Sequence, residues 1–118
     1  MAAARSIYLT GFSGSGKSTI AALVGARLGW PVLDTDRIIV EQSGMSIPTI
    51  FEREGEAGFR ARETEALRSV TSGGPYVIAT GGGLPVRAEN RRLMAASGWV
   101  IQLDTRPEKI QARIQEQL

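Results

Sequence analysis

The feature that most constrains this chain is the segment GFSGSGKS at positions 11–18, which matches the pattern G-x-x-x-x-G-K-[ST]. A β-rich apolar run at 7–10 precedes it and a helical pattern at 17–28 follows it. Small residues let successive backbone N–H groups surround a phosphate, and a helix start adds its positive dipole end. Lys17 would then reach the β- and γ-phosphates, and the Ser18 hydroxyl would ligate Mg²⁺. A chance Gly/Ser turn is the alternative.

Apolar runs alternate with helical patterns along the rest of the chain. The further runs lie at 32–33, 76–79 and 99–103. Such strands, with helices between them, predict an α/β fold with a parallel sheet covered on both faces. In the first expected helix, one apolar stripe is formed by Ile20, Leu23, Val24 and Leu28. Helical pieces are expected over 34–72, with breaks at Gly44, Pro48 and Gly55, and a further helix over Asn90–Ala96. A capping box at Thr105–Glu108 predicts the start of a last helix. The aromatic residues expected only to pack are Tyr8, Trp30, Tyr76 and Trp99.

Composition narrows the chemistry. The 118 residues predict one domain, and the absence of Cys and His excludes disulfides, thiolate or imidazole metal ligands and an imidazole base. The net charge is only +2, and no run of Lys or Arg predicts nucleic-acid binding. No apolar stretch approaches the ~20 residues of a membrane span. We therefore expect a soluble, cytoplasmic protein without a membrane or nucleic-acid partner.

Two further polar segments follow predicted strands. Asp34-Thr35-Asp36 ends the second run, and its carboxylates can face different partners, a metal ion and a hydroxyl. The alternative is a solvated loop in which Asp36 caps the next helix. Gly81-Gly82-Gly83 follows the third run and permits close approach of backbone to a ligand, or is simply a flexible turn. In an open parallel sheet, ligands bind at the carboxyl ends of the strands, so all three segments are expected at one rim.

A carboxylate interrupts an apolar helical face within 56–70. Phe59, Glu63, Leu67 and Val70 share that face, and Arg60 lies three residues before Glu63. A buried carboxylate requires a cationic partner, so Arg60 is expected to pair with Glu63 and to offer its remaining donors to an incoming carboxylate. A surface ion pair is the alternative. Phe51 is expected in the core or in a pocket wall.

In order, GFSGSGKST at 11–19, DTDRII at 34–39, IFEREGEAGFRARE at 50–63 and GGG at 81–83 closely resemble shikimate kinase. The resemblance implies a P-loop NTPase fold with three α/β/α layers and parallel strand order 2-3-1-4, followed by a fifth strand that this chain lacks. It implies Mg²⁺- and ATP-dependent phosphorylation of the shikimate 3-hydroxyl, giving shikimate 3-phosphate in chorismate and aromatic amino-acid biosynthesis. A monomer with ATP and shikimate as its small-molecule partners is expected.

The resemblance also implies residue roles. Catalytic roles fall to Lys17 and to Asp36, which would bind ring hydroxyls and receive the proton of the attacking one. Arg60, steadied by Glu63, would bind the shikimate carboxylate. The remaining assignments are Gly14, Ser15, Gly16, Lys17, Ser18, Thr19 and Arg113 for ATP, Ser18 with Asp34 for Mg²⁺, and Gly81, Gly82, Gly83, Phe51 and Phe59 for shikimate.

The family continues well past the position of Leu118, so the domain over 1–118 is expected to be incomplete at its C-terminal end. The part that follows in the family carries a lid with a phosphoryl-stabilising arginine. We therefore expect this chain by itself to be a poor kinase. Two alternatives remain: a non-catalytic module that binds nucleotide or shikimate, and a related small-molecule kinase that acts on an acid such as gluconate.

Overall fold

A computed structural model of the chain describes residues 5–11 and 16–103. Four strands form one parallel sheet in the order β2-β3-β1-β4, as the resemblance predicts. The strands are β1 (Ser6–Thr10), β2 (Val32–Asp34), β3 (Val77–Ala79) and β4 (Gly98–Gln102). The central strands β1 and β3 are buried along their whole length, whereas β2 and β4 form the edges of this part of the sheet.

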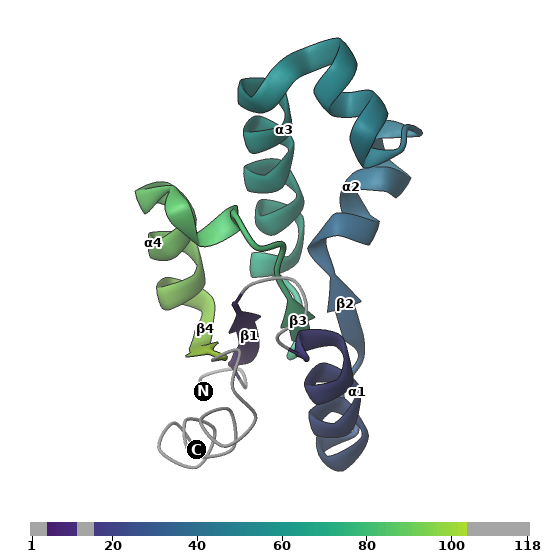
Figure 1. Cartoon of the computed structure of the whole chain (residues 1–118). Coiled ribbons are helices and arrows are strands. Elements are labelled where there is room, and N and C mark those ends of the chain that lie inside the picture. The colour runs from purple at the N-terminus through teal and green to yellow at the C-terminus, as the bar shows by residue number, and fades with distance from the viewer. Residues whose placement is uncertain (1–4, 12–15, 104–118) are drawn as a thin grey trace.

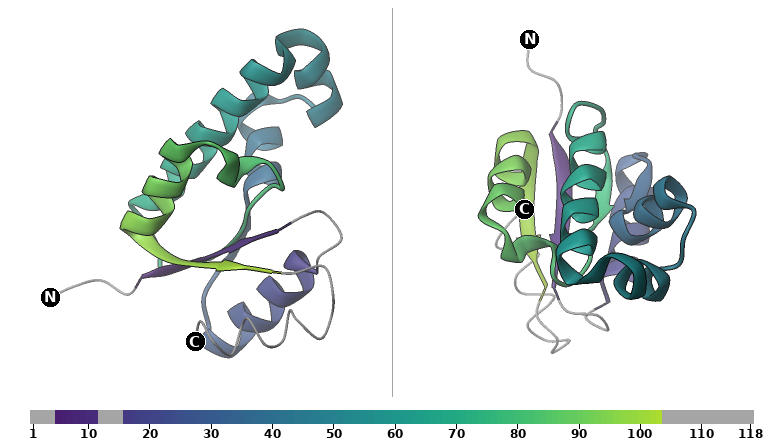
Figure 2. Two further views of the ribbon diagram at one scale, coloured as in Figure 1. Left: turned by 60° about the vertical axis from the view of Figure 1, so that its left-hand side comes forward. Right: turned by 90° about the horizontal axis from the view of Figure 1, so that it is seen from above.

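Helices cover both faces of the sheet (Figures 1 and 2). On one face lies α1 (Lys17–Leu28), and on the other lie α3 (Ile47–Thr71) and α4 (Ala88–Ser97). One core cluster joins α1 to Ile7, Leu9 and Val77, and a second joins α3 and α4 to Tyr8 and Ile78. The sheet is therefore the middle of three layers. None of the helices in the described ranges is long and apolar enough to cross a membrane.

The segment after β2 forms two helices, α2 (Thr35–Ser43) and α3. Gly44 ends α2 in the left-handed conformation, as predicted. Pro48 was expected to break a helix, but it lies in the first turn of α3, where its missing N–H leaves no hydrogen bond unmade. Gly55 interrupts α3 at φ 72° and ψ −175°, which confirms the break predicted there. The helix expected over Asn90–Ala96 extends from Ala88 to Ser97.

The predicted packing of α1 is wrong in part. Leu23 and Leu28 are exposed, although Ile20 and Val24 pack against the core as expected. The buried residues of α1 are Ala21 and Gly25, and a Cβ at Gly25 would lie 2.3 Å from Val32 Cγ2. The helix approaches the sheet through its small residues, and this orientation turns Leu23 and Leu28 outward.

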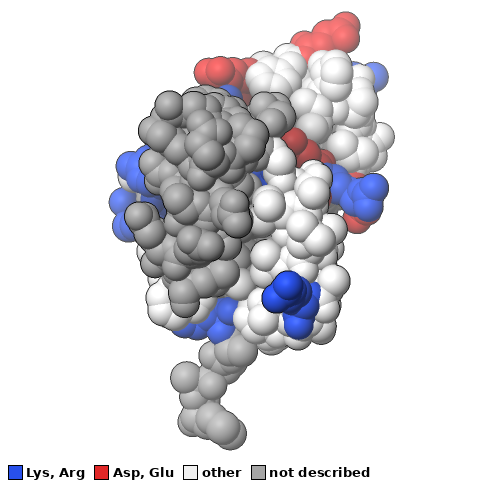
Figure 3. Space-filling view, turned by 60° about the horizontal axis from the view of Figure 1, so that its bottom comes forward, with Lys and Arg blue, Asp and Glu red and all other residues white. Residues whose placement is uncertain are grey.

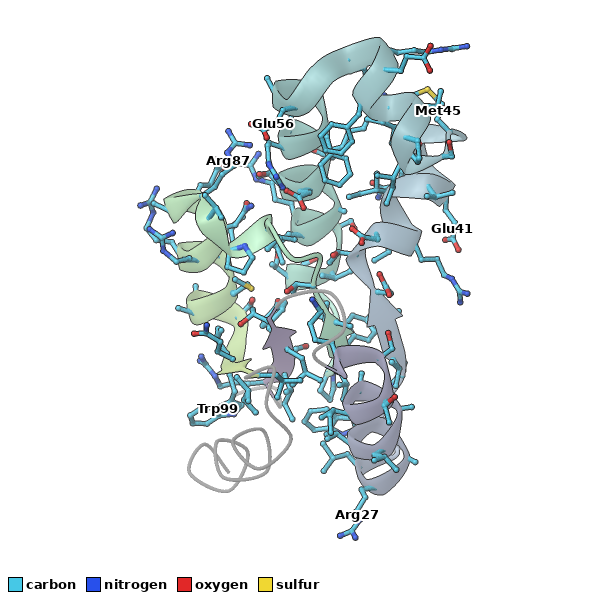
Figure 4. The ribbon with its side chains drawn as sticks, in the orientation of Figure 1. Arg27, Glu41, Met45, Glu56, Arg87 and Trp99 are labelled. Carbon is cyan, nitrogen blue, oxygen red and sulfur yellow. The ribbon has the colours of Figure 1, made fainter. Side chains whose placement is uncertain are left out.

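Trp99 was predicted only to pack, but 58% of it is exposed. Figure 4 shows it projecting from the β4 edge, and the Arg5 guanidinium lies 5.4 Å from the centre of its ring. β4 pairs with β1 on one side only in the described part of the chain, so its side chains are less covered than those of β1. Tyr8, by contrast, is fully buried, and its hydroxyl lies 2.7 Å from Ser97 Oγ. The segment expected to carry the capping box at Thr105–Glu108 lies outside the described residues.

Candidate active site

One cavity of about 320 Å³ opens at the carboxyl ends of the central strands. It is lined by residues of three segments: 16–19 at the start of α1, Asp34 and Asp36 around the start of α2, and 79–82 after β3. The three turns that sequence analysis expected at one rim of the sheet do lie at that rim. Gly14 and Ser15 of the nucleotide-binding segment, and Arg113, lie outside the described residues.

Lys17 lies near both Gly11 and the two aspartates after β2. Its ammonium donates a hydrogen bond to the carbonyl oxygen of Gly11. Burial lowers the pKa of Lys17 from its ordinary value, and the charges of Asp36 and Asp34 oppose that shift. Residues 16–19 at the start of α1 also line the cavity, and the unpaired backbone N–H groups of a helix N-terminus favour an anion.

The two aspartates after β2 have different environments. Asp34 is the N-cap of α2, since its Oδ1 accepts hydrogen bonds from Asp36 N at 2.9 Å and Arg37 N at 3.3 Å. The alternative interpretation placed the cap at Asp36 and is wrong, because the helix already begins at Thr35. The carboxylate of Asp36 does not cap the helix, and Asp36 lines the cavity. Burial raises the pKa of Asp36, with a further contribution from Asp34, and Lys17 opposes the rise.

Arg60 and Glu63 form the predicted ion pair on α3. Arg60 Nη1 donates to Glu63 Oε1 at 2.8 Å, and Glu63 is only 1% exposed while Arg60 is partly exposed. The surface-pair alternative is therefore wrong for Glu63. Burial raises the pKa of Glu63, the hydrogen bond and charge of Arg60 lower it, and the charge of Asp36 raises it further. Arg60 Nη2 also lies 4.0 Å from the exposed Glu56 Oε2, a weak surface contact with which a second carboxylate would compete for the remaining guanidinium nitrogens.

The glycine turn, residues 81–83, brings these groups together. A Cβ at Gly81 would lie 2.7 Å from Asp36 Oδ1 and 3.3 Å from Glu63 Oε2. A Cβ at Gly83 would lie 2.3 Å from Arg60 Nη1. A side chain at Gly81 or Gly83 would therefore displace the charged ends of Asp36 or Arg60 from their present positions. Asp36 thus borders both the cavity and the Arg60–Glu63 pair.

Two phenylalanines lie beside the pair. The rings of Phe51 and Phe59 stack with centroids 4.6 Å apart, and the Arg60 guanidinium carbon lies 5.5 Å from the centre of the Phe59 ring. Phe59 is buried, whereas Phe51 is 38% exposed. Phe51 is thus partly open to solvent and stacks on Phe59, which is packed into the contact between α2 and α3.

Sequence reasoning missed Thr35. Its fully buried hydroxyl accepts a hydrogen bond from Gly81 N at 2.9 Å and so joins the start of α2 to the glycine turn. Thr35 lies between the two aspartates in the sequence, but no sequence pattern distinguishes a buried, hydrogen-bonded threonine there from an exposed one. Thr64, Arg87 and Asn90 were missed as well, because their hydrogen bonds join segments far apart in the sequence.

A sequence profile described as Shikimate kinase matches residues 13–118. The chain belongs to the shikimate kinase family. The shikimate kinase of Dechloromonas aromatica is 48% identical over 103 residues, which cover 87% of this chain and 56% of that protein. That of Geobacter metallireducens is 45% identical over 113 residues, which cover 96% and 63%.

Solved structures of shikimate kinases agree with this fold. The structure titled shikimate kinase from Acinetobacter baumannii in complex with shikimate superposes with a TM-score of 0.84 at 43% identity. That match covers 93% of this chain and 62% of the other. The chain thus spans less than two thirds of the length of each of these relatives.

Shikimate kinases use Mg²⁺ with ATP, and the residues of this site fit that ion. In the ranges 5–11 and 16–103, no group of three or more Asp, Glu, His or Cys side chains is placed to hold a metal. Mg²⁺ suits such a site because it retains several waters and is held by one or two carboxylates together with substrate phosphates. Ser18 and Asp34, which both line the cavity, are oxygen donors of the right kind.

Proposed function

We propose that the protein transfers the γ-phosphoryl group of Mg²⁺-bound ATP to the 3-hydroxyl of shikimate. The observation that carries the proposal is the position of Asp36, which lines the cavity together with Lys17 and lies against Gly81 beside Glu63. A nucleotide in the cavity and an acid at Arg60 would both reach Asp36. The family membership supplies the identity of that acid.

In this proposal Asp36 receives the proton of the shikimate 3-hydroxyl as its oxygen attacks the γ-phosphorus. The bond from the γ-phosphorus to the bridging oxygen breaks, and ADP leaves. A carboxylate with a raised pKa suits this step, because a base is most effective when its pKa is nearer the working pH. Lys17 would hold the β- and γ-phosphates, while bound Mg²⁺ would offset the charge that develops on them.

Arg60 would orient the acceptor. Its guanidinium is held by Glu63 on one side and lies over Phe59, so its remaining nitrogens would bind the shikimate carboxylate in a fixed direction, in place of the weak contact with the exposed Glu56. Backbone N–H groups of Gly82 and Gly83 would serve as additional donors, and Phe51 and Phe59 would form an apolar wall for the ring. Phosphoryl transfer depends chiefly on such positioning.

The test measures ADP release in the presence of Mg²⁺-ATP with shikimate or gluconate as acceptor. Two samples are compared: the 118-residue chain and the complete product of its gene. We expect release with shikimate from the complete product and little from the chain, which spans only 56–63% of the two bacterial relatives. ADP release with gluconate but not with shikimate would contradict the proposal that shikimate is the acceptor.

Calorimetry on the same two samples tests the alternative of a binding module. We expect both ATP and shikimate to bind the complete product. Binding without turnover in either sample would favour a non-catalytic module, and the absence of shikimate binding in both would contradict the proposal.

A further inference from the structure

A chain of buried hydrogen bonds joins the segment after the glycine turn to the middle of α3. Asn90, on α4, is fully buried, and its Nδ2 donates to the carbonyl oxygen of Leu84 at 2.8 Å. Leu84 begins the short helix η1 (Leu84–Val86) that directly follows Gly83. Thr64 Oγ1 donates to Asn90 Oδ1 at 2.8 Å. The side chain of Asn90 therefore ties η1 to α3.

Arg87 continues this chain as far as Arg60. Its Nη1 donates to Thr64 Oγ1 at 3.0 Å and to the carbonyl oxygen of Arg60 at 3.1 Å. Figure 4 shows Arg87 near the upper end of α4, on the side toward α3. The hydroxyl of Thr64 is thus both a donor and an acceptor, and it links Asn90 to Arg87.

The same two segments also meet at the site. The Arg60 guanidinium packs against Gly83 so closely that a Cβ there would lie 2.3 Å from Arg60 Nη1. The contact and the hydrogen-bond chain form a closed loop from Gly83 through Leu84, Asn90 and Thr64 to Arg60. A shift of α3 at Arg60 away from η1 would strain the buried hydrogen bonds that Asn90 makes with Thr64 and Leu84, and a buried polar group that loses its partner is costly.

We propose that Thr64 and Asn90 are positioning residues that hold Arg60 in register with the glycine turn and thereby set the affinity for the acceptor's carboxylate. Neither residue lines the cavity. The inference rests on the proposed function for its substrate, but its geometric part, the coupling between α3 and η1, does not. In this proposal, Thr64 and Asn90 support the acceptor side of the site and do not contribute to the nucleotide side.

The first experiment compares Thr64→Val, which keeps the shape of the side chain without its hydroxyl, with Thr64→Ser, which keeps the hydroxyl. In the complete gene product we expect Thr64→Val to raise KM for shikimate roughly tenfold, or about 1.4 kcal/mol. KM for ATP should stay within about twofold, because segment 16–19 is not in the network. Thr64→Ser should restore KM for shikimate. Thr71→Val is the matched control, since Thr71 also lies on α3 and donates to Arg68 O of the same helix.

The second experiment needs no substrate. Leu84 N donates to Gly81 O and Val86 N donates to Gly83 O, each at 3.1 Å. In Thr64→Val we expect amide hydrogen exchange at Leu84 and Val86 to be roughly tenfold faster than in the unmodified protein, because η1 has lost a link to α3. Thr64→Ser and Thr71→Val should exchange at the original rates.

The outcomes separate the two proposals. Failure of the proposed function appears in the unmodified protein as no shikimate-dependent ADP release, and hydrogen exchange then still tests the coupling. Unchanged exchange in Thr64→Val, or an equal rise of KM for shikimate and ATP, would overturn the positioning role. If Thr64→Val does not fold, Arg87→Met replaces it, because Arg87 is exposed and lies outside the core. We expect about threefold faster exchange at Leu84 and Val86, and unchanged rates would overturn the role.

Discussion

The proposed nucleotide side and the proposed acceptor side of the site are built differently. The nucleotide side, residues 16–19, is one contiguous segment in which Gly16, Ser18 and Thr19 are exposed. The acceptor side consists of Asp36, the Arg60–Glu63 pair and the glycine turn, which belong to three separate segments. Its groups are tied by hydrogen bonds, such as Gly81 N to Thr35 Oγ1 and Arg60 to the buried Glu63.

This difference shows how the fold divides general from specific recognition. A phosphate is bound by backbone N–H groups and one lysine, and a short motif is enough to place them. A particular acid requires side chains from several elements at fixed separations, so the core must hold them. On the part of the face that Figure 3 shows in white and colour, Lys and Arg form separate groups.

The largest expected effect is at Asp36, where the two sides meet. Asp36→Asn removes the proton acceptor, so kcat for shikimate phosphorylation should fall by about 10²–10⁴-fold. If Asp36 is the proton acceptor, its raised pKa should give the unmodified protein an acid limb in kcat/KM above the ordinary value of 3.8. Activity is lost as the pH falls through this raised pKa, because the protonated carboxyl cannot accept the proton. Steady-state kinetics over a range of pH measures both the fall in kcat and the acid limb. A normal kcat in Asp36→Asn would show that Asp36 is not the proton acceptor.

A smaller effect should separate the two sides. Arg60→Ala should raise KM for shikimate roughly 10- to 100-fold, the value of one or more hydrogen bonds to a charged group, with little change in KM for ATP. Arg62→Ala is the control, because Arg62 lies on the same helix and pairs with Glu54 at 2.7 Å on the surface. Equal effects of Arg60→Ala on both constants would show that the sides are not independent.

The smallest expected effect concerns stability. Burial raises the pKa of Glu63 above its ordinary 4.5, so the folded protein holds this proton more tightly than the unfolded chain does. This contribution to stability is complete below pH 4.5 and is lost as the pH rises through the raised pKa. Glu63→Gln lacks it, so its free energy of unfolding should decline less between acid and neutral pH. Urea denaturation at several pH values measures the difference, and parallel curves would contradict it.

Sequence analysis anticipated those parts of the fold and site that depend on local pattern. The alternation of apolar runs and helical patterns predicted the strands and the three layers, and the break at Gly55 was visible as a glycine within a helical pattern. The Arg60–Glu63 pair was also predictable, because three residues on a helix place two side chains together. The functional roles of these site residues remain predictions.

Other features depended on contacts that no local pattern encodes. The orientation of α1 follows from the close approach of Gly25 to Val32, and the cap at Asp34 from where α2 begins. Thr35, Thr64 and Asn90 read as ordinary polar residues until the fold places their partners beside them.

The amino-acid sequence by itself determined that this chain forms a parallel α/β sheet and led us to predict a phosphate-binding turn before Lys17, because glycine, lysine and apolar periodicity act over short distances. Only the tertiary structure decided which side chains face one another across the glycine turn. Gly81 approaches Asp36 and Glu63, and Gly83 approaches Arg60, because β3, α2 and α3 are packed by a common core. Such separations are set by the packing of whole elements, in which each buried polar group must find its partner.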